Sequence, residues 1–140
     1  MAKSTNAIEK LSVTLIDTAL VLVLSIPDYL IFGFNNYYKI IVVLLFLACN
    51  LTYILVSKNR CLGMILLNIY WKRNYPIKNQ LIYAVLYTLS FATAFIWLFL
   101  PFDLLLVNLL LVQLPLVLKT GSTLHGYLSG KMSGYRKTKK

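Results

Sequence analysis

Long apolar runs separated by short polar and basic segments dominate this chain, and they predict membrane-spanning helices. A helix needs about 20 mostly apolar residues to cross roughly 30 Å of hydrocarbon. Four segments approach that length, and Pro101 separates the last two so closely that we expect them to form an antiparallel hairpin. The four predicted spans are residues 11–31, 40–56, 81–100 and 102–118.

The composition supports this interpretation and limits the number of domains. Of the 140 residues, 59% are hydrophobic and only 13% are charged, whereas about 25% are charged in an ordinary soluble domain. The mean hydropathy is +0.75. The sequence therefore predicts an all-α integral membrane protein, and its length allows a single transmembrane domain, residues 1–140.

The positive charge is distributed unevenly about the predicted spans. Every lysine and arginine except Lys39 precedes the first span, lies between the second and third, or follows the fourth. By the positive-inside rule, both termini and the central loop then face the cytoplasm of a multi-pass protein in the cell membrane. This topology accounts for the formal net charge of +10 without a nucleic-acid partner. It also places the basic loop and the tail, residues 119–140, near anionic lipid headgroups.

The central loop, residues 59–79, contains an apolar run that is too short to span a membrane. Two structures remain open for it. It forms an interfacial helix with Tyr70 and Trp71 at the headgroup level, or it begins as a helical turn and continues as a strand. In the second case we expect the strand to pair with the C-terminal segment 127–136. Either way, the loop and the tail form a small cytoplasmic cap.

One carboxylate lies inside the first predicted span. Asp17 is the seventh residue of that span, roughly 10 Å from its cytoplasmic edge, where an ionisable group costs about 2.5–3.5 kcal/mol. Lys10 and Thr14 share a helical face with it. We therefore expect Asp17 to face the bundle interior, with Lys10 or a polar cluster from neighbouring helices as its partner.

Other polar residues in the spans are candidates for the same cluster, or for contacts that hold the helices together. Asn50 lies in the second span and Asn108 in the fourth, where Gln113 is too far along a regular helix to share its face. Pro115 is expected to kink the fourth span. A polar face also follows the third span. The candidate ion or polar-cluster residues are Asp17, Lys10, Thr14, Asn50 and Asn108.

The sequence lacks the residue patterns of an enzyme, so we expect no catalytic residues, no cofactor and no metal. His125 is the single histidine and has no neighbouring ligand residues, so a capping or hydrogen-bonding role is favoured over metal binding. Cys49 and Cys61 are too few for a disulfide framework. We expect both to be reduced and structural.

Three segments resemble the RDD family of membrane proteins. They are KLSVTLID from Lys10 to Asp17, CLGMILLNIYWKRNYP from Cys61 to Pro76, and TLHGYLSG from Thr123 to Gly130. Lys10 stands where the family usually has arginine, and Gly126 where it has a second aspartate. The resemblance implies a multi-pass membrane protein, and some family members are linked to sodium/proton exchange.

Two functions from different classes remain open. In the first, the chain handles ions or exchanges a cation for protons through a polar cluster around Asp17, and so small a bundle would then favour a homo-oligomer. In the second, it is a non-catalytic assembly or accessory protein whose intramembrane polar residues serve helix packing or docking of a membrane-protein partner. A pore-forming protein is a third interpretation, based on the small size and the basic tail.

Overall fold

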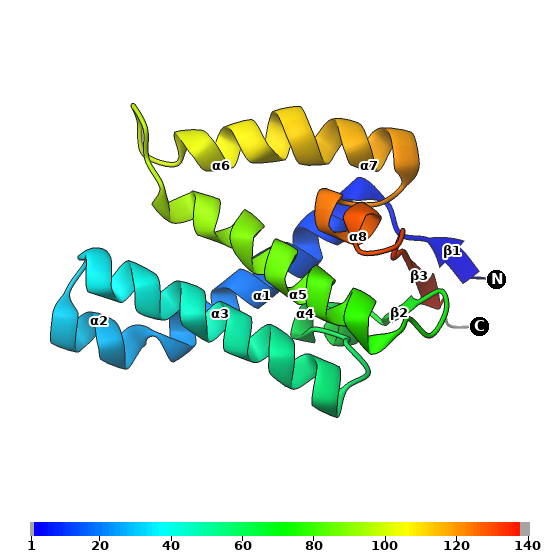
Figure 1. Cartoon of the computed structure of the whole chain (residues 1–140), viewed down its shortest axis with the longest axis horizontal. Coiled ribbons are helices and arrows are strands. Elements are labelled where there is room, and N and C mark those ends of the chain that lie inside the picture. The colour runs from blue at the N-terminus through cyan, green and yellow to red at the C-terminus, as the bar shows by residue number, and fades with distance from the viewer. Residues whose placement is uncertain (1, 138–140) are drawn as a thin grey trace.

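A computed structural model describes residues 2–137 and is predominantly helical, with one small sheet (Figure 1). The helices form a bundle, and the sheet lies at the end of the molecule where the two ends of the chain meet. The elements, in chain order, are β1 (Ala2–Ser4), α1 (Ala7–Leu24), α2 (Ile26–Phe32), α3 (Asn36–Val56), α4 (Leu62–Leu66), β2 (Ile69–Trp71), α5 (Ile77–Ala92), η1 (Thr93–Phe95), α6 (Asp103–Val107), η2 (Asn108–Gln113), α7 (Leu114–Thr120), α8 (Leu124–Leu128) and β3 (Gly134–Lys137).

Within residues 2–137, two helices are long and apolar enough to cross a membrane, and a bent pair makes a third if it is counted as one span. The two are α3 and the continuous helix Asp103–Thr120, which comprises α6, η2 and α7. The bent pair is α1 with α2. The predicted helical class is therefore confirmed, and these two or three helices agree with the predicted association with a membrane, whereas four spans remain a prediction. Large apolar side chains cover the outer surfaces of these helices, as Leu55 at 84% and Leu118 at 74% exposure illustrate, and such a surface suits lipid rather than water.

The first predicted span is bent, which the sequence analysis did not anticipate. α1 starts at a capping box in which Asn6 and Glu9 bond each other's backbone amides, and it ends at Ser25. After a bend of 51° the chain continues as α2. Pro27 lies in the first turn of α2, where its missing N–H and its ring prevent one straight helix from continuing. The Ser25 hydroxyl bonds Leu22 O at this break.

The third predicted span is shorter than expected. α5 contains 16 residues and ends at Ala92, followed by the single 3₁₀ turn η1. Residues 96–102 are not helical. The Asp103 carboxylate accepts hydrogen bonds from three backbone amides of this turn, those of Leu98, Phe99 and Leu100. The aspartate therefore stabilises a broad turn where the sequence predicted a helix up to residue 100.

Pro115 does not produce the expected kink in the fourth predicted span; a π-helical segment precedes it instead. The six residues Asn108–Gln113 form the π-helical segment η2, and Pro115 lies in the first turn of the following helix, α7. A π-helical turn shifts the backbone hydrogen-bonding pattern by one residue relative to an α-helix. The helix therefore passes the proline as one continuous element.

The central loop and the tail form the expected cap. The loop contains the short helix α4 followed by strand β2, and β2 pairs antiparallel with β3 of the tail. The proposed helical turn and strand are therefore confirmed, as is the pairing with the tail. The strand order is β1-β3-β2; the N-terminal strand β1 was not anticipated. Tyr70 and Tyr135 are opposite each other in the register, with ring centroids 6.0 Å apart, a favourable cross-strand pair.

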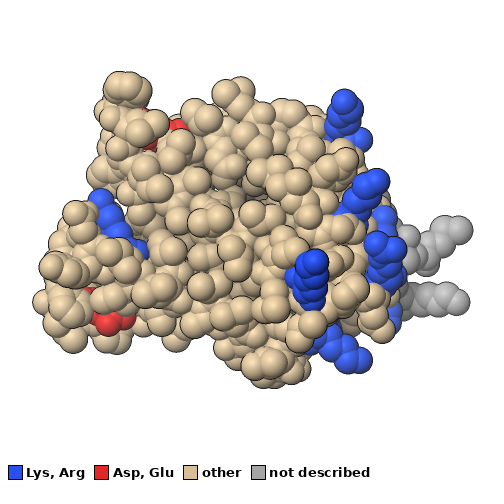
Figure 2. Space-filling model, in the orientation of Figure 1, with Lys and Arg blue, Asp and Glu red and all other residues tan. Residues whose placement is uncertain are grey.

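Charge is concentrated at the sheet end of the molecule. Figure 2 shows lysine and arginine gathered there, with acidic residues and one basic patch toward the other end. Lys39 belongs to that far end, where its ammonium lies over the rings of Phe34 and Trp97. The Arg136 guanidinium forms an ion pair of 3.2 Å with Glu9, which joins β3 to the first turn of α1.

An apolar core fills the space between α1, α3 and α5. Phe46 and Phe91 stack with centroids 4.1 Å apart, and Val21 and Val42 are almost completely buried beside them. Close packing of this kind is typical of protein interiors. Tyr87 belongs to this core at the side that faces the cap, and its ring packs edge to face on Phe46. Its hydroxyl donates a hydrogen bond to Asp17.

Candidate functional site

Asp17 lies in α1 at the junction between the bundle and the cap, and it is 4% exposed. One carboxylate oxygen, Oδ1, accepts a hydrogen bond of 2.9 Å from the Gly63 backbone amide. The other, Oδ2, accepts one of 3.1 Å from the Tyr87 hydroxyl. Both oxygens are therefore bonded by donors of the chain itself. We call Asp17, Thr14, Gly63 and Tyr87 the Asp17 cluster.

The bond to Gly63 joins two elements that are far apart in sequence. Gly63 lies in the first turn of α4, where backbone amides have no partner within the helix, and an anion near a helix N-terminus is favourable. A Cβ atom at Gly63 would lie 2.5 Å from Val13 O, so only glycine lets α4 approach α1 this closely. Asp17 thus supplies from α1 the acceptor that the start of α4 needs.

The neighbouring Cys61 side chain is buried beside the same carboxylate. Burial, together with the charge of Asp17, raises the pKa of the Cys61 thiol well above its usual range. The thiol therefore stays protonated at neutral pH, which agrees with a structural role. Both cysteines are free, as expected for reduced residues.

Lys10 was one of the two partners predicted for Asp17, and the structure does not pair them. Its ammonium donates hydrogen bonds to Thr5 O at 3.0 Å and to Gly121 O at 2.7 Å. Gly121 is the residue that ends α7, and a cation is favourable at the C-terminal end of a helix. Among the residues that the structure describes, no salt bridge involves Asp17.

Thr14 belongs to the cluster, as predicted, but only as a weak partner. Its hydroxyl donates to Lys10 O within α1 at 3.2 Å and lies 3.4 Å from the Tyr87 hydroxyl. Asn50 is buried, but its amide donates to Phe46 O of its own helix at 3.0 Å. No hydrogen bond found in the described part of the chain joins Asn50 to Asp17. The predicted association of these two residues is therefore not supported.

Asn108 lies in a second cluster, centred on Ser90 of α5. The Ser90 hydroxyl accepts from the Asn108 amide at 2.8 Å and from the Gln113 amide at 3.3 Å. The π-helical segment brings Asn108 and Gln113 onto one face, with a contact of 3.4 Å between them, so the expectation that they do not share a face was wrong. Gln113 also accepts from the Leu124 amide at 2.9 Å and so joins η2 to α8.

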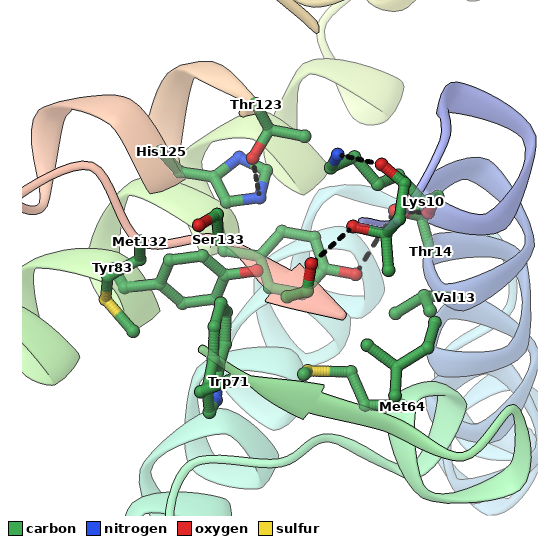
Figure 3. Close-up of a pocket in the computed structure, with 14 residues that line it drawn as sticks. Lys10, Val13, Thr14, Met64, Trp71, Tyr83, Thr123, His125, Met132 and Ser133 are labelled. Carbon is green, nitrogen blue, oxygen red and sulfur yellow. Dashed lines mark hydrogen bonds between the residues drawn. The ribbon is translucent and has the colours of Figure 1, made fainter. Parts of the chain in front are cut away.

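A small cavity lies between the Asp17 cluster and the cap (Figure 3). Its volume is about 50 Å³, enough for a few water molecules but far below the several hundred Å³ of a site for a small-molecule substrate. Lys10, Thr14, Tyr87 and His125 supply polar groups to its wall. The remaining wall is mainly apolar and includes Val13, Met64, Trp71, Tyr83 and Met132.

His125 is buried in the wall of this cavity. Its ring stacks on Tyr87 at 4.7 Å and meets Tyr83 edge to face at 4.8 Å. Nε2 lies 3.0 Å from the Thr123 hydroxyl, while Nδ1 has no hydrogen-bond partner among the described residues. Burial lowers the pKa of His125 to about 3, so the ring is neutral at physiological pH. Its bond to Thr123 agrees with the hydrogen-bonding role that the sequence favoured.

Gly63 was not expected to contribute to either cluster, and Gln113 and Tyr87 were expected only as polar residues of the predicted spans, without these partners. Gly63 and Gln113 contribute through tertiary contacts that no local pattern indicates, whereas Tyr87 lies on the polar face of the third predicted span. Within residues 2–137, no group of three or more His, Cys, Asp or Glu side chains is placed to hold a metal ion. No protein-family model, curated protein or solved structure matches this chain.

Proposed function

We propose that this chain is a non-transporting accessory protein of the cytoplasmic membrane, in which the helical bundle displays the folded basic cap on the cytoplasmic side. The proposed topology has four spans with both termini inside, and α5 with η1 forms the shortest span. The gathering of basic residues at the sheet end supports this orientation. A membrane-protein partner or a second copy of the chain would dock on the bundle or the cap.

The observation that carries the proposal is the bonding of Asp17. Both carboxylate oxygens are taken by donors that join α1 to α4 and α5, so the residue has a packing role that needs no ion. Polar contacts of this type hold membrane helices together. Lys10 is likewise bonded to two carbonyls of its own chain.

Cation/proton exchange through Asp17 is the second candidate function. The Tyr87 hydroxyl connects Asp17 to the cavity lined by Lys10 and His125, which would give protons a route from the cap. On the other side of Asp17, however, the described core is apolar, with Val21, Phe46 and Phe91 packed together. A charge crossing that region would have to lose its hydration without polar partners, which favours the accessory function.

We also propose that the chain is a divergent member of the RDD family. The three resembling segments converge at the Asp17 cluster, which supports the proposal: Asp17 bonds Gly63 of the second segment, and His125 of the third stacks on Tyr87. The family's second aspartate does not fit this packing without a shift, because a Cβ at Gly126 would lie 2.9 Å from Met132 O.

Reconstitution into liposomes separates the two functions. Wild type, Asp17→Asn and the control Thr52→Val, an exposed threonine on α3, are tested for dissipation of an imposed pH gradient on addition of Na⁺ or K⁺. The accessory function predicts that all three match protein-free liposomes, while an added exchange ionophore collapses the gradient. Exchange by wild type and Thr52→Val that Asp17→Asn lacks, with folding preserved, would overturn it.

A further inference from the structure

A basic groove lies at the sheet end of the molecule, between the last turn of α3 and the first turn of α5. Its volume is about 440 Å³, within the range of small-molecule and headgroup sites. Lys58, Arg60 and Arg73 line it, and none of the described lining residues is acidic. The groove is separate from the Asp17 cluster, and the sequence analysis did not identify it.

The two arginines are held in place by aromatic neighbours. The Arg60 guanidinium lies 3.9 Å from the centre of the Tyr70 ring, and its Nε donates to Ile69 O at 3.1 Å. Arg73 lies 5.0 Å from the centre of the Tyr75 ring. Contact with an aromatic ring orients the planar guanidinium while its edge can still donate to an oxyanion. One terminal nitrogen of Arg73, Nη2, already donates a long hydrogen bond of 3.4 Å to Gly130 O. Phosphate is a group that arginine recognises with paired hydrogen bonds.

Asn59 is a buried polar residue in the wall of the groove. It is 6% exposed and lines the groove, and its side-chain nitrogen has no hydrogen-bond partner among the described residues. Buried polar groups in folded proteins nearly always have a partner. The nitrogen is itself buried, so it would donate to an oxyanion in the groove only after the Asn59 side chain turns toward it.

The groove is continuous with the surface that suits lipid. Ile54 and Ile77 form part of its wall, and Ile77 is 62% exposed. Leu55 and Leu81 next to them are also exposed, on the outer faces of α3 and α5. A water-soluble phosphate would leave these apolar side chains exposed, whereas an acyl chain would bury them.

We propose that this groove binds the phosphate of an anionic phospholipid, whose acyl chains lie along the exposed apolar side chains of α3 and α5. The inference rests on the membrane orientation in the proposed function and names a ligand for the cap. It is independent of whether Asp17 carries ions. If the chain neither binds the lipid nor exchanges ions, only the lipid site is rejected. If it binds the lipid and also exchanges ions, only the accessory function is rejected.

The test uses the full chain in zwitterionic detergent micelles and reads the fluorescence of Trp71, which lines the groove. Trp97→Phe removes the second tryptophan. Phosphatidylglycerol is titrated in one arm, phosphatidylcholine in the second, and water-soluble glycerol phosphate in the third. We expect a saturable change with phosphatidylglycerol only.

Two pairs of charge-neutralising substitutions then test the location. Lys58→Gln/Arg73→Gln removes two cations from the groove, and Lys72→Gln/Lys119→Gln removes two from outside it. Each charged side chain of the groove would lose a direct charge-assisted contact with the bound phosphate, so we expect the groove pair to weaken the apparent affinity by about 10- to 30-fold, equivalent to about 1.4–2 kcal/mol. The outside pair is expected to stay within about threefold of the parent.

Equal weakening by both pairs would overturn the proposal, because general surface charge would then explain binding. A response to glycerol phosphate at the same concentration as the lipid would also overturn it and would assign the groove to a soluble phosphate. Circular dichroism checks the fold. If the groove pair does not fold, Arg73→Lys decides: it keeps the charge on an exposed side chain but loses the planar fork, and unchanged affinity would reject phosphate recognition there.

Discussion

Removing the Asp17 carboxylate tests whether this side chain holds the cap onto the bundle. In Asp17→Ala the Gly63 amide loses its acceptor, and an unsatisfied buried amide costs about 1–3 kcal/mol. The Tyr87 hydroxyl also loses a charged acceptor, worth about 1.5–3 kcal/mol. Since the carboxylate no longer has to be desolvated, the two losses do not add fully. We expect the free energy of unfolding to fall by about 2–4 kcal/mol.

Asp17→Asn separates the shape of the side chain from its charge. The amide oxygen still accepts from Gly63, and the amide nitrogen donates to the Tyr87 hydroxyl, which accepts as readily as it donates. Both hydrogen bonds therefore persist in neutral form. We expect a loss of no more than about 2 kcal/mol, the difference between charged and neutral hydrogen bonds.

A double-mutant cycle isolates the contact between Asp17 and Tyr87. Tyr87→Phe removes only the hydroxyl, and together with Asp17→Ala it should show a coupling free energy of about 1–2 kcal/mol. Equilibrium unfolding in mixed micelles, followed by far-ultraviolet circular dichroism, measures all four proteins. Thr52→Val is the control and should lie within about 0.5 kcal/mol of wild type. If Asp17→Ala matches this control, or the cycle shows no coupling, the structural role of Asp17 is refuted.

Three further predictions follow from single contacts and use the same unfolding measurement. Gly63→Ala should cost about 1–3 kcal/mol, because the new methyl group meets Val13 O; unchanged stability would contradict the close approach of α4 to α1. Gln113→Leu should cost about 1–3 kcal/mol, since the Leu124 amide loses its acceptor, and a neutral result would mean that α8 is held by other contacts. Burial depresses the pKa of His125 from 6.5 to about 3, so its contribution to stability is complete above pH 6.5 and is lost as the pH falls toward 3. Between pH 7.5 and 5, titration of this group should lower the free energy of unfolding of wild type by about 2 kcal/mol. The decrease in His125→Phe over the same range should be smaller by about 2 kcal/mol. Equal decreases in the two proteins would show that the ring is not buried in its neutral form.

Local sequence patterns predicted much of the architecture. Apolar runs located α3 and the helix Asp103–Thr120, because hydropathy depends on composition alone. The aromatic and β-branched residues of the central loop made a strand one of two open structures, and the structure shows that strand, β2, paired with β3 of the tail. The four-span topology and the location in the cytoplasmic membrane stay predictions.

The features that the sequence analysis missed depend on contacts between distant residues. Asp17 was recognised as unusual, but its partners Gly63 and Tyr87 come from two other elements, and neither is charged. Lys10 shares a helical face with Asp17, yet the end of α7 at Gly121 takes its ammonium instead. The common face of Asn108 and Gln113 arises only because η2 is π-helical, and that departure from regular helical spacing has no clear mark in the sequence.

The Gly63 amide gives the most direct test of the central claim, that Asp17 holds the cap to the bundle. The chain has only six glycines, so ¹⁵N-glycine labelling yields a spectrum in which each can be assigned by substitution. Amide hydrogen exchange at Gly63 is then compared in wild type, Asp17→Ala and the control Asn50→Ala. Slow exchange in wild type and Asn50→Ala, with fast exchange in Asp17→Ala, is the predicted result. Exchange at Gly63 that is equally slow in Asp17→Ala, or already fast in wild type, would contradict it.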